Sequence, residues 1–74
     1  MPVVWKDHIV SDAGILRGKP HLKGTRIPVS LVLGYLAAGS SPDQIVAEFP
    51  DLTHDQIAAC LDYARDLAEF AVEA

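Results

Sequence analysis

Cysteine and long apolar runs are both scarce in this chain. The single cysteine, Cys60, excludes an internal disulfide. Lone thiols are typical of reducing compartments, so we expect a cytoplasmic protein. No apolar run approaches the ~20 residues that a membrane-spanning helix needs. Residues 1–10 also lack the apolar segment and cleavage site of a signal peptide, so we expect no secretion.

Positive charge is scarce in the second half of the sequence. The 74 residues carry a net charge of −4. Residues 1–40 hold five Lys or Arg against two Asp, whereas residues 41–74 hold only Arg65 against eight Asp or Glu. This asymmetry indicates two surfaces suited to different partners.

The length predicts one small domain. A hydrophobic content of 50% argues against disorder. Chains this short bury a modest fraction of their surface and often gain stability by dimerising or docking on a partner, so we expect a homodimer. We divide the domain into a short β or extended basic arm over residues 1–26 and three helices over residues 27–74.

Two extended pieces are predicted in the arm. The β-branched stretch HIVSD (8–12) indicates a short strand that ends in a turn at Ala13–Gly14. A second piece follows in ILRGKPHLKG (15–24), where Pro20 excludes a central strand but allows an edge strand or a bend. The two pieces predict a hairpin, or pairing with a second chain.

The apolar spacing then changes to that of helices. A first helix is predicted over about 28–38, apolar nearly all round and therefore the central core element. Gly39 would end it in a left-handed conformation. SPDQ (41–44) and THDQ (53–56) both fit the capping box that starts a helix. They predict a second helix over about 42–49, stopped by Pro50, and a third over about 54–71. The third carries a predicted buried stripe of Ile57, Leu61, Ala64, Ala68 and Ala71.

A short helix, a turn and a second capped helix are typical of a helix-turn-helix, whose second helix reads the DNA major groove. Fold class is therefore predicted as mainly α, a three-helix bundle with a short N-terminal β segment. The candidate base-reading residues are Thr53, His54, Gln56 and Ala59, and the candidate phosphate contacts are Lys19, Lys23 and Arg26. Most capped helical hairpins bind no DNA, and Asp55 opposes a polyanion. A protein-interaction module without DNA binding is the alternative.

The glycine-rich basic stretch GKPHLKGTR (18–26) does not fit a phosphate-binding loop. That motif needs Lys and then Ser or Thr directly after its last glycine, whereas Gly24 is followed by Thr25 and Arg26. Nucleotide binding is therefore not predicted.

Catalysis and metal binding are not predicted either. His8, His21 and His54 are too widely spaced to indicate a metal site. Cys60 fits a small buried thiol better than a nucleophile. We expect no enzyme, no cofactor and no metal. Trp5 is expected to cover the small core, with an interface anchor as the alternative.

Residues 8–65 resemble domain-of-unknown-function family 433. The stretches GKPHLKGTRIPV and GSSPDQIVAEFPDL carry the resemblance. It implies a homeodomain-like helix-turn-helix, and for many members an antitoxin, some of VapB type, encoded beside a PIN-like ribonuclease toxin. It further implies binding to that toxin and to operator DNA. Lys19, Lys23, Thr25 and Arg26 match the basic motif, and residues 42–64 match the helix-turn-helix.

The acidic face of the third helix fits the toxin role. The active site of a nuclease binds polyanionic RNA, so its surroundings tend to be basic. Complementary charge and apolar anchors would then dock this helix on the toxin. The candidate partner-binding residues are Asp62, Asp66, Leu67, Glu69 and Phe70, with Glu73 on the same face. A solvated helix face is the alternative.

Overall fold

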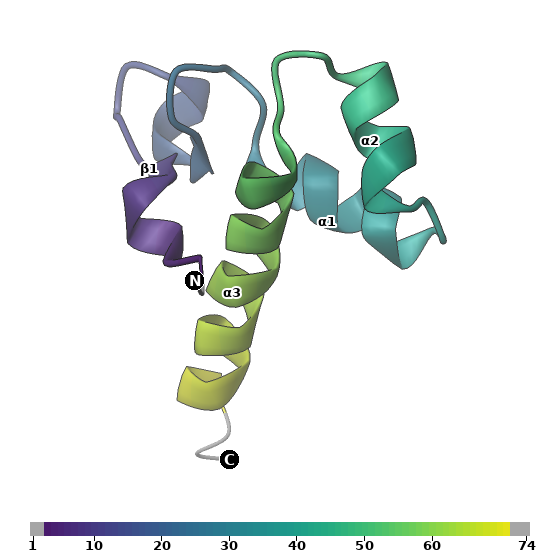
Figure 1. Cartoon of the computed structure of the whole chain (residues 1–74). Helices are drawn as coiled ribbons and strands as arrows, with labels where there is room; N and C mark the ends of the chain where they lie inside the picture. The colour runs from purple at the N-terminus through teal and green to yellow at the C-terminus, as the bar shows by residue number, and fades with distance from the viewer. Residues whose placement is uncertain (1–2, 72–74) are drawn as a thin grey trace.

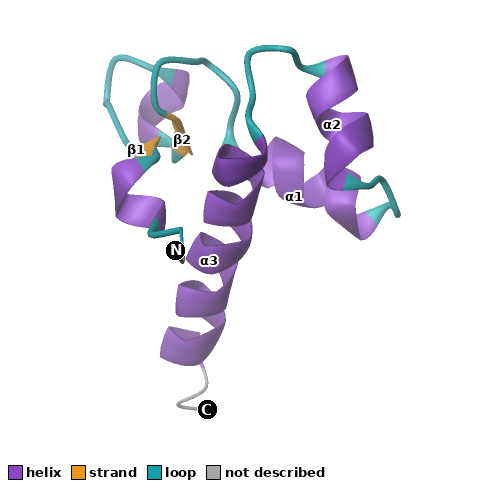
Figure 2. Ribbon diagram, in the orientation of Figure 1, coloured by secondary structure: helices purple, strands orange, loops and turns teal. Residues whose placement is uncertain are grey.

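Three α-helices and a small antiparallel sheet make up the domain (Figures 1 and 2). This computed structural model describes the backbone of residues 3–71 and the side chains of residues 3–69. The elements, with η for a 3₁₀ turn, are η1 (Trp5–Asp7), β1 (Ile9–Val10), η2 (Leu16–Gly18), β2 (His21–Leu22), α1 (Val29–Ala37), α2 (Pro42–Glu48) and α3 (His54–Ala71). The predicted mainly α class is confirmed. Within residues 3–71 no helix is long and apolar enough to cross a bilayer.

The predicted N-terminal hairpin is present but short. β1 and β2 pair antiparallel, with Ile9 opposite Leu22. Each strand has two residues, because the chain between them turns sharply. Leu16 and Arg17 have φ angles of 52° and 56°, and Gly18 follows at 83°. Left-handed backbone conformations are costly for residues other than glycine, so the surrounding structure must hold this turn in place.

The predicted end of α1 is confirmed. Gly39 has a φ of 99°, which glycine adopts without steric cost. Its N–H donates to the carbonyl of Leu36 (3.0 Å), and the next N–H, of Ser40, donates to the carbonyl of Tyr35 (3.0 Å). These bonds satisfy carbonyls at the end of the helix. At its start, Pro28 lies just outside the helix instead of inside its first turn.

Both predicted capping boxes are formed. The N–H of Gln44 donates to Ser41 Oγ (3.2 Å), and the N–H of Ser41 donates to Gln44 Oε1 (2.8 Å). Thr53 and Gln56 repeat the arrangement at 3.2 and 2.9 Å. Such reciprocal bonds fix where a helix begins. α2 therefore starts at Pro42 and α3 at His54, as predicted, and residues 49–53 connect them.

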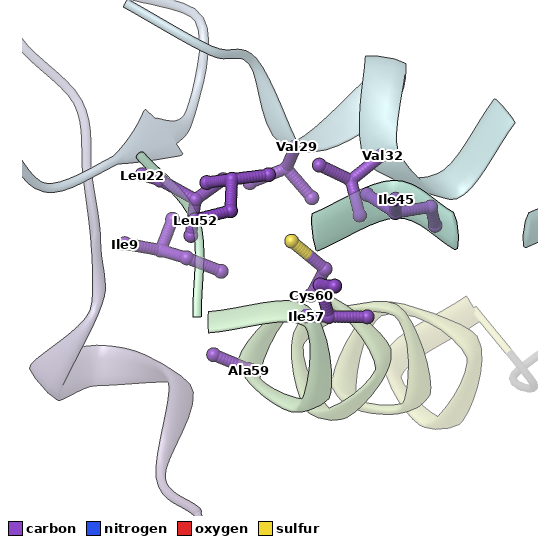
Figure 3. Packing of buried hydrophobic residues seen from close by; sticks show 9 residues of the cluster. All are labelled: Ile9, Leu22, Val29, Val32, Ile45, Leu52, Ile57, Ala59 and Cys60. Carbon is purple, nitrogen blue, oxygen red and sulfur yellow. The ribbon is translucent and has the colours of Figure 1, made fainter. Parts of the chain in front are cut away.

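The core draws on the sheet, all three helices and the connection before α3 (Figure 3). Its buried apolar members are Ile9, Leu22, Val29, Val32, Ile45, Leu52, Ile57, Ala59 and Cys60. Of the residues in α1, only Val29 and Val32 are buried, and Leu31 is 40% exposed. The prediction that α1 is the central core element is therefore wrong. The N-terminal segment packs on α3 and leaves one side of α1 to solvent.

The predicted buried stripe of α3 is correct only at its start. Ile57 is buried, but Leu61 is 49% exposed and Ala68 is exposed. The covered face instead runs through Ala59 and Cys60, because η1, α1 and α2 pack against this helix. Since Ala59 is fully buried, the predicted contact of this residue with base edges is wrong.

Candidate nucleic-acid and partner surfaces

Residues 23–26 form a turn before α1, here named the basic turn, which lies at the same end of the molecule as the connection between α2 and α3 (Figure 1). Lys23, Arg26 and Asp51 all line one open cavity of about 870 Å³. Asp51 belongs to the α2–α3 connection, so two of the predicted phosphate contacts lie next to the start of α3. Only the tertiary fold brings these segments together.

Thr25 shapes this turn. Its hydroxyl donates to the carbonyl of Leu22 (2.8 Å) and accepts the N–H of Ile27 (3.0 Å). Gly24, with a φ of 82°, supplies the left-handed residue that the turn needs. The side chains of Lys23 and Arg26 are thereby left exposed on either side of it.

Lys19 lies in a different place from Lys23 and Arg26. It lines a separate hollow at the start of α1, together with Arg17 and Ser30. The left-handed turn at Leu16–Gly18 places Arg17 there. The sequence pattern did not single out Arg17, because nothing in it shows that two non-glycine residues adopt this conformation. The cations of the arm thus form two groups.

The predicted base-reading side chains are exposed or half-buried, and all three make hydrogen bonds within the protein. Gln56 Oε1 and Thr53 Oγ1 are used by the capping box. His54 Nε2 lies 2.6 Å from Asp43 Oδ1, a contact that joins the first turns of α2 and α3. A pair this exposed contributes little to stability.

Acidic side chains share this end of the molecule. Asp43, Asp51 and Asp55 are all exposed near the start of α3. Lys23 and Arg26 line one cavity with Asp51. DNA binding here must therefore overcome local repulsion as well as the net negative charge of the chain.

His21 lines the same cavity although it is only 2% exposed. Its Nδ1 lies 3.1 Å from the carbonyl of Lys19, which indicates the tautomer with a proton on Nδ1. Neither the burial of His21 nor its hydrogen bond to the Lys19 carbonyl was predicted from the sequence. Among the described residues, no three His, Cys, Asp or Glu side chains are arranged to hold a metal ion.

Trp5 occupies part of the predicted partner surface on α3. Its indole N–H donates to Asp66 Oδ2 (2.7 Å), and its backbone N–H donates to Asp62 Oδ2 (3.1 Å). The ring packs edge-on against Tyr63 with centroids 4.8 Å apart. Arg65 Nη2 also lies 3.0 Å from Asp62 Oδ1. These two carboxylates therefore hold the N-terminal segment on α3, a long-range contact that no local pattern reveals.

The later part of the predicted partner surface is open. Leu67 is 52% exposed, and Glu69 is exposed. The last turns of α3 project beyond the rest of the domain (Figure 1). The side chain of Phe70, and Glu73 altogether, lie outside the described residues.

Cys60 is a core residue, as predicted. It is fully buried, with its sulfur pointing toward Val29, Val32 and Leu52 (Figure 3). Burial raises the pKa of the thiol from 9.0 to about 11. A thiol that stays protonated in the native protein is a poor nucleophile, so the geometry assigns this cysteine to packing.

Three comparisons place the chain among known proteins. The model of a family described as "Protein of unknown function (DUF433)" matches residues 9–64. An uncharacterized protein of Sinorhizobium fredii, y4eO, is 33% identical over 60 residues, which are 81% of this chain and 27% of that protein. The chain thus spans about a quarter of the length of this curated relative.

A solved structure has the same fold. The crystal structure of a DUF433 member protein from Anabaena variabilis superposes with a TM-score of 0.79 at 26% sequence identity. The match covers 88% of this chain and 64% of the other. The arrangement of three helices and a short sheet is therefore shared with a protein of the same family.

Proposed function

Since this chain belongs to the DUF433 family, we propose that it is a cytoplasmic antitoxin that neutralises a PIN-like ribonuclease toxin and represses its own operon by binding operator DNA. The family resemblance suggests the role. The observation that supports it is the length and position of α3, a helix of 18 residues. It follows directly on the α2–α3 connection, whose Asp51 lines the same cavity as Lys23 and Arg26, and its last turns project from the domain (Figure 1).

In this proposal, α2, residues 49–53 and α3 act as a homeodomain-like helix-turn-helix. Recognition helices of this type insert their first residues into the major groove. Thr53 and His54 are exposed at that point, and Gln56 keeps its amide N–H groups as donors for base edges. Lys23 and Arg26 then contact the phosphates beside the groove.

The acidic neighbours limit how tightly one copy can bind. Two cations at the cavity face three carboxylates near α3, so a single copy has little attraction for a polyanion. A homodimer doubles the number of base and phosphate contacts. Operators of helix-turn-helix proteins match this arrangement, because their half-sites follow the two-fold symmetry of the protein.

The toxin would dock on the projecting part of α3. Leu61 and Leu67 are about half exposed at 49% and 52%, and Glu69 adds negative charge. Apolar anchors within an acidic surrounding suit the basic mouth of a ribonuclease. Asp62 and Asp66 can join this surface only if Trp5 leaves them, since both now bind the N-terminal segment.

The DNA-binding half is tested with the upstream DNA of the protein's own gene in a salt series. Specific binding should weaken as salt rises, with a slope set by the number of phosphates contacted. Lys23→Ala and Arg26→Ala should each weaken binding to all sequences and reduce the slope by about 1 for each copy, hence by about 2 for the homodimer. Lys6→Ala is the control, because it removes the same charge from an exposed position on η1. Equal losses in all three variants would reject the proposed phosphate contacts.

The toxin-binding half is tested separately with the product of the adjacent gene. We expect Leu67→Lys to weaken the complex by at least about tenfold, because it places a like charge and a polar group against a basic apolar site. Ala13→Lys, an exposed change in the turn after β1, is the control. An adjacent product that binds both variants as tightly as the native chain would contradict the assigned surface.

A protein-interaction module without DNA binding is the second candidate. It is favoured by the hydrogen bonds that engage Thr53, His54 and Gln56 within the protein and by the three carboxylates around them. A tight protein complex together with no salt-dependent binding to the upstream DNA would select this candidate.

A further inference from the structure

α1 exposes an apolar face that the monomer does not cover. The helix contains no charged residue. Its exposed residues are Ser30, Leu31, Gly34 and Ala37, followed by the exposed Ala38 just after the helix, and Leu31 is 40% exposed. A helix on the surface of a soluble domain normally turns charged or strongly polar side chains to water. An uncovered apolar face of this kind indicates an interaction surface.

This face is the middle of a groove that has opposite charges at its two ends. The central hollow, of about 340 Å³, is lined by Ser30, Leu31, Gly34, Tyr35 and Ala38. A hollow at the start of α1 shares Ser30 with it and is lined by Arg17 and Lys19. A hollow near the end of α1 shares Tyr35 and is lined by Gln44 and Glu48. Glu48 also accepts a hydrogen bond from the Tyr35 hydroxyl at 2.6 Å.

Gly34 lies at the centre of this groove without a reason in the monomer. Glycine inside a helix destabilises it relative to alanine. The backbone of Gly34 has no positive φ, and a Cβ built there meets nothing within 4 Å. Alanine would therefore fit in the isolated chain. The missing side chain leaves room for another backbone to approach this position closely.

We propose that α1 is the interface of a symmetric homodimer, in which the α1 helices of two copies pack antiparallel with their Gly34 residues at the crossing point. The two-fold axis then brings Arg17 and Lys19 of one copy next to Glu48 of the other, and the same contact is repeated at the opposite end. A second copy is thus the occupant whose charges match both ends of the groove. The antiparallel pairing also opposes the two helix dipoles favourably.

This interface leaves the proposed functional surfaces open. Lys23 and Arg26 line a different cavity, and Leu67 lies on the projecting turns of α3. Dimerisation through α1 needs neither DNA nor a toxin, so it is measured on the protein alone. Its failure would remove α1 as the dimer interface but would not decide whether the chain binds DNA or a toxin, and failure of either binding assay would not decide whether α1 dimerises.

The first test is Gly34→Arg, followed by sedimentation equilibrium over a range of protein concentrations. Two arginines would meet at the two-fold axis, so the dimer dissociation constant should rise by roughly 100-fold or more. Far-UV circular dichroism should show an unchanged fold, because the site is open in the monomer. Ala68→Arg, an exposed change on the distal part of α3, is the matched control and should dimerise like the native chain.

The second test exchanges the charges at the two ends of the groove. Lys19→Glu and Glu48→Lys should each weaken the dimer by roughly tenfold. The double variant should recover most of that loss, because unlike charges face each other again. A native chain that is monomeric at every concentration, a Gly34→Arg variant that dimerises normally, or a double variant no better than the singles would each overturn the proposal.

Discussion

The contact between Trp5 and α3 gives the most direct test of how this small domain is held together. Trp5 is the only tryptophan in the chain, so its fluorescence reports on this contact alone. We consider three variants: Trp5→Ala, which removes the whole contact, Trp5→Phe, which keeps an aromatic ring but loses the indole N–H, and Asp66→Ala, which removes the acceptor.

The structure sets the size of the expected effects. The bond from the indole N–H to Asp66 is short at 2.7 Å, but it is exposed, so we assign it about 1 kcal/mol. The edge-on pair with Tyr63 adds about 1 kcal/mol beyond burial. Trp5 is half-buried, so the apolar area it removes from water contributes about 1 kcal/mol more. Trp5→Ala should therefore lower the free energy of unfolding by about 3 kcal/mol, and Trp5→Phe or Asp66→Ala by about 1 kcal/mol.

Urea unfolding followed by far-UV circular dichroism measures these differences. In Asp66→Ala the fluorescence of Trp5 should also shift toward that of a more solvated indole. Asp7→Asn is the control, since it alters an exposed residue of η1 and leaves all three contacts in place. If Trp5→Ala unfolded at the same urea concentration as the native chain, the N-terminal segment would not be bound to α3. Asp62 and Asp66 would then be available to a partner.

Two further predictions concern single residues. Cys60 should resist alkylation in the native protein and react on unfolding, and ready alkylation of the native chain would contradict its assignment to the core. Because burial raises the pKa of this thiol from 9.0 to about 11, the free energy of unfolding should fall by up to about 3 kcal/mol as pH rises through that interval. Cys60→Ala should remove this pH dependence. Gly39→Ala should lower stability by about 1–2 kcal/mol, because Gly39 has a positive φ. Gly34→Ala, the matched change on a helical backbone, should raise the stability of the monomer by up to about 1 kcal/mol. Thermal unfolding at low protein concentration measures both effects.

The helices could be predicted because their signals are local. Ser41 and Gln44, or Thr53 and Gln56, are three residues apart, and each pair forms the same two hydrogen bonds wherever the helix lies in the fold. Gly39 ends α1 for a similarly local reason, its left-handed conformation. Helix bounds therefore needed no knowledge of the rest of the chain.

Which face of each helix is buried could not be predicted in the same way. The apolar pattern of α1 is nearly uniform, so it does not show which side meets the core and which meets solvent. On α3 the predicted stripe through Leu61 and Ala68 is exposed, because η1, α1 and α2 pack against the helix elsewhere. The packing of distant segments decides this, and periodicity does not record it.

The candidate surfaces show the same division. The sequence by itself determined the three helices, their ends, the family and the uneven charge, because these depend on residue types and short spacings. Only the tertiary structure separated Arg17 and Lys19 from Lys23 and Arg26, and placed the latter pair beside the α2–α3 connection. It also placed Trp5 in hydrogen-bonding contact with Asp62 and Asp66, which lie 57 and 61 positions further along the chain. Contacts of that range follow from how the whole chain packs, and they decide which charged side chains stay exposed for the proposed partners.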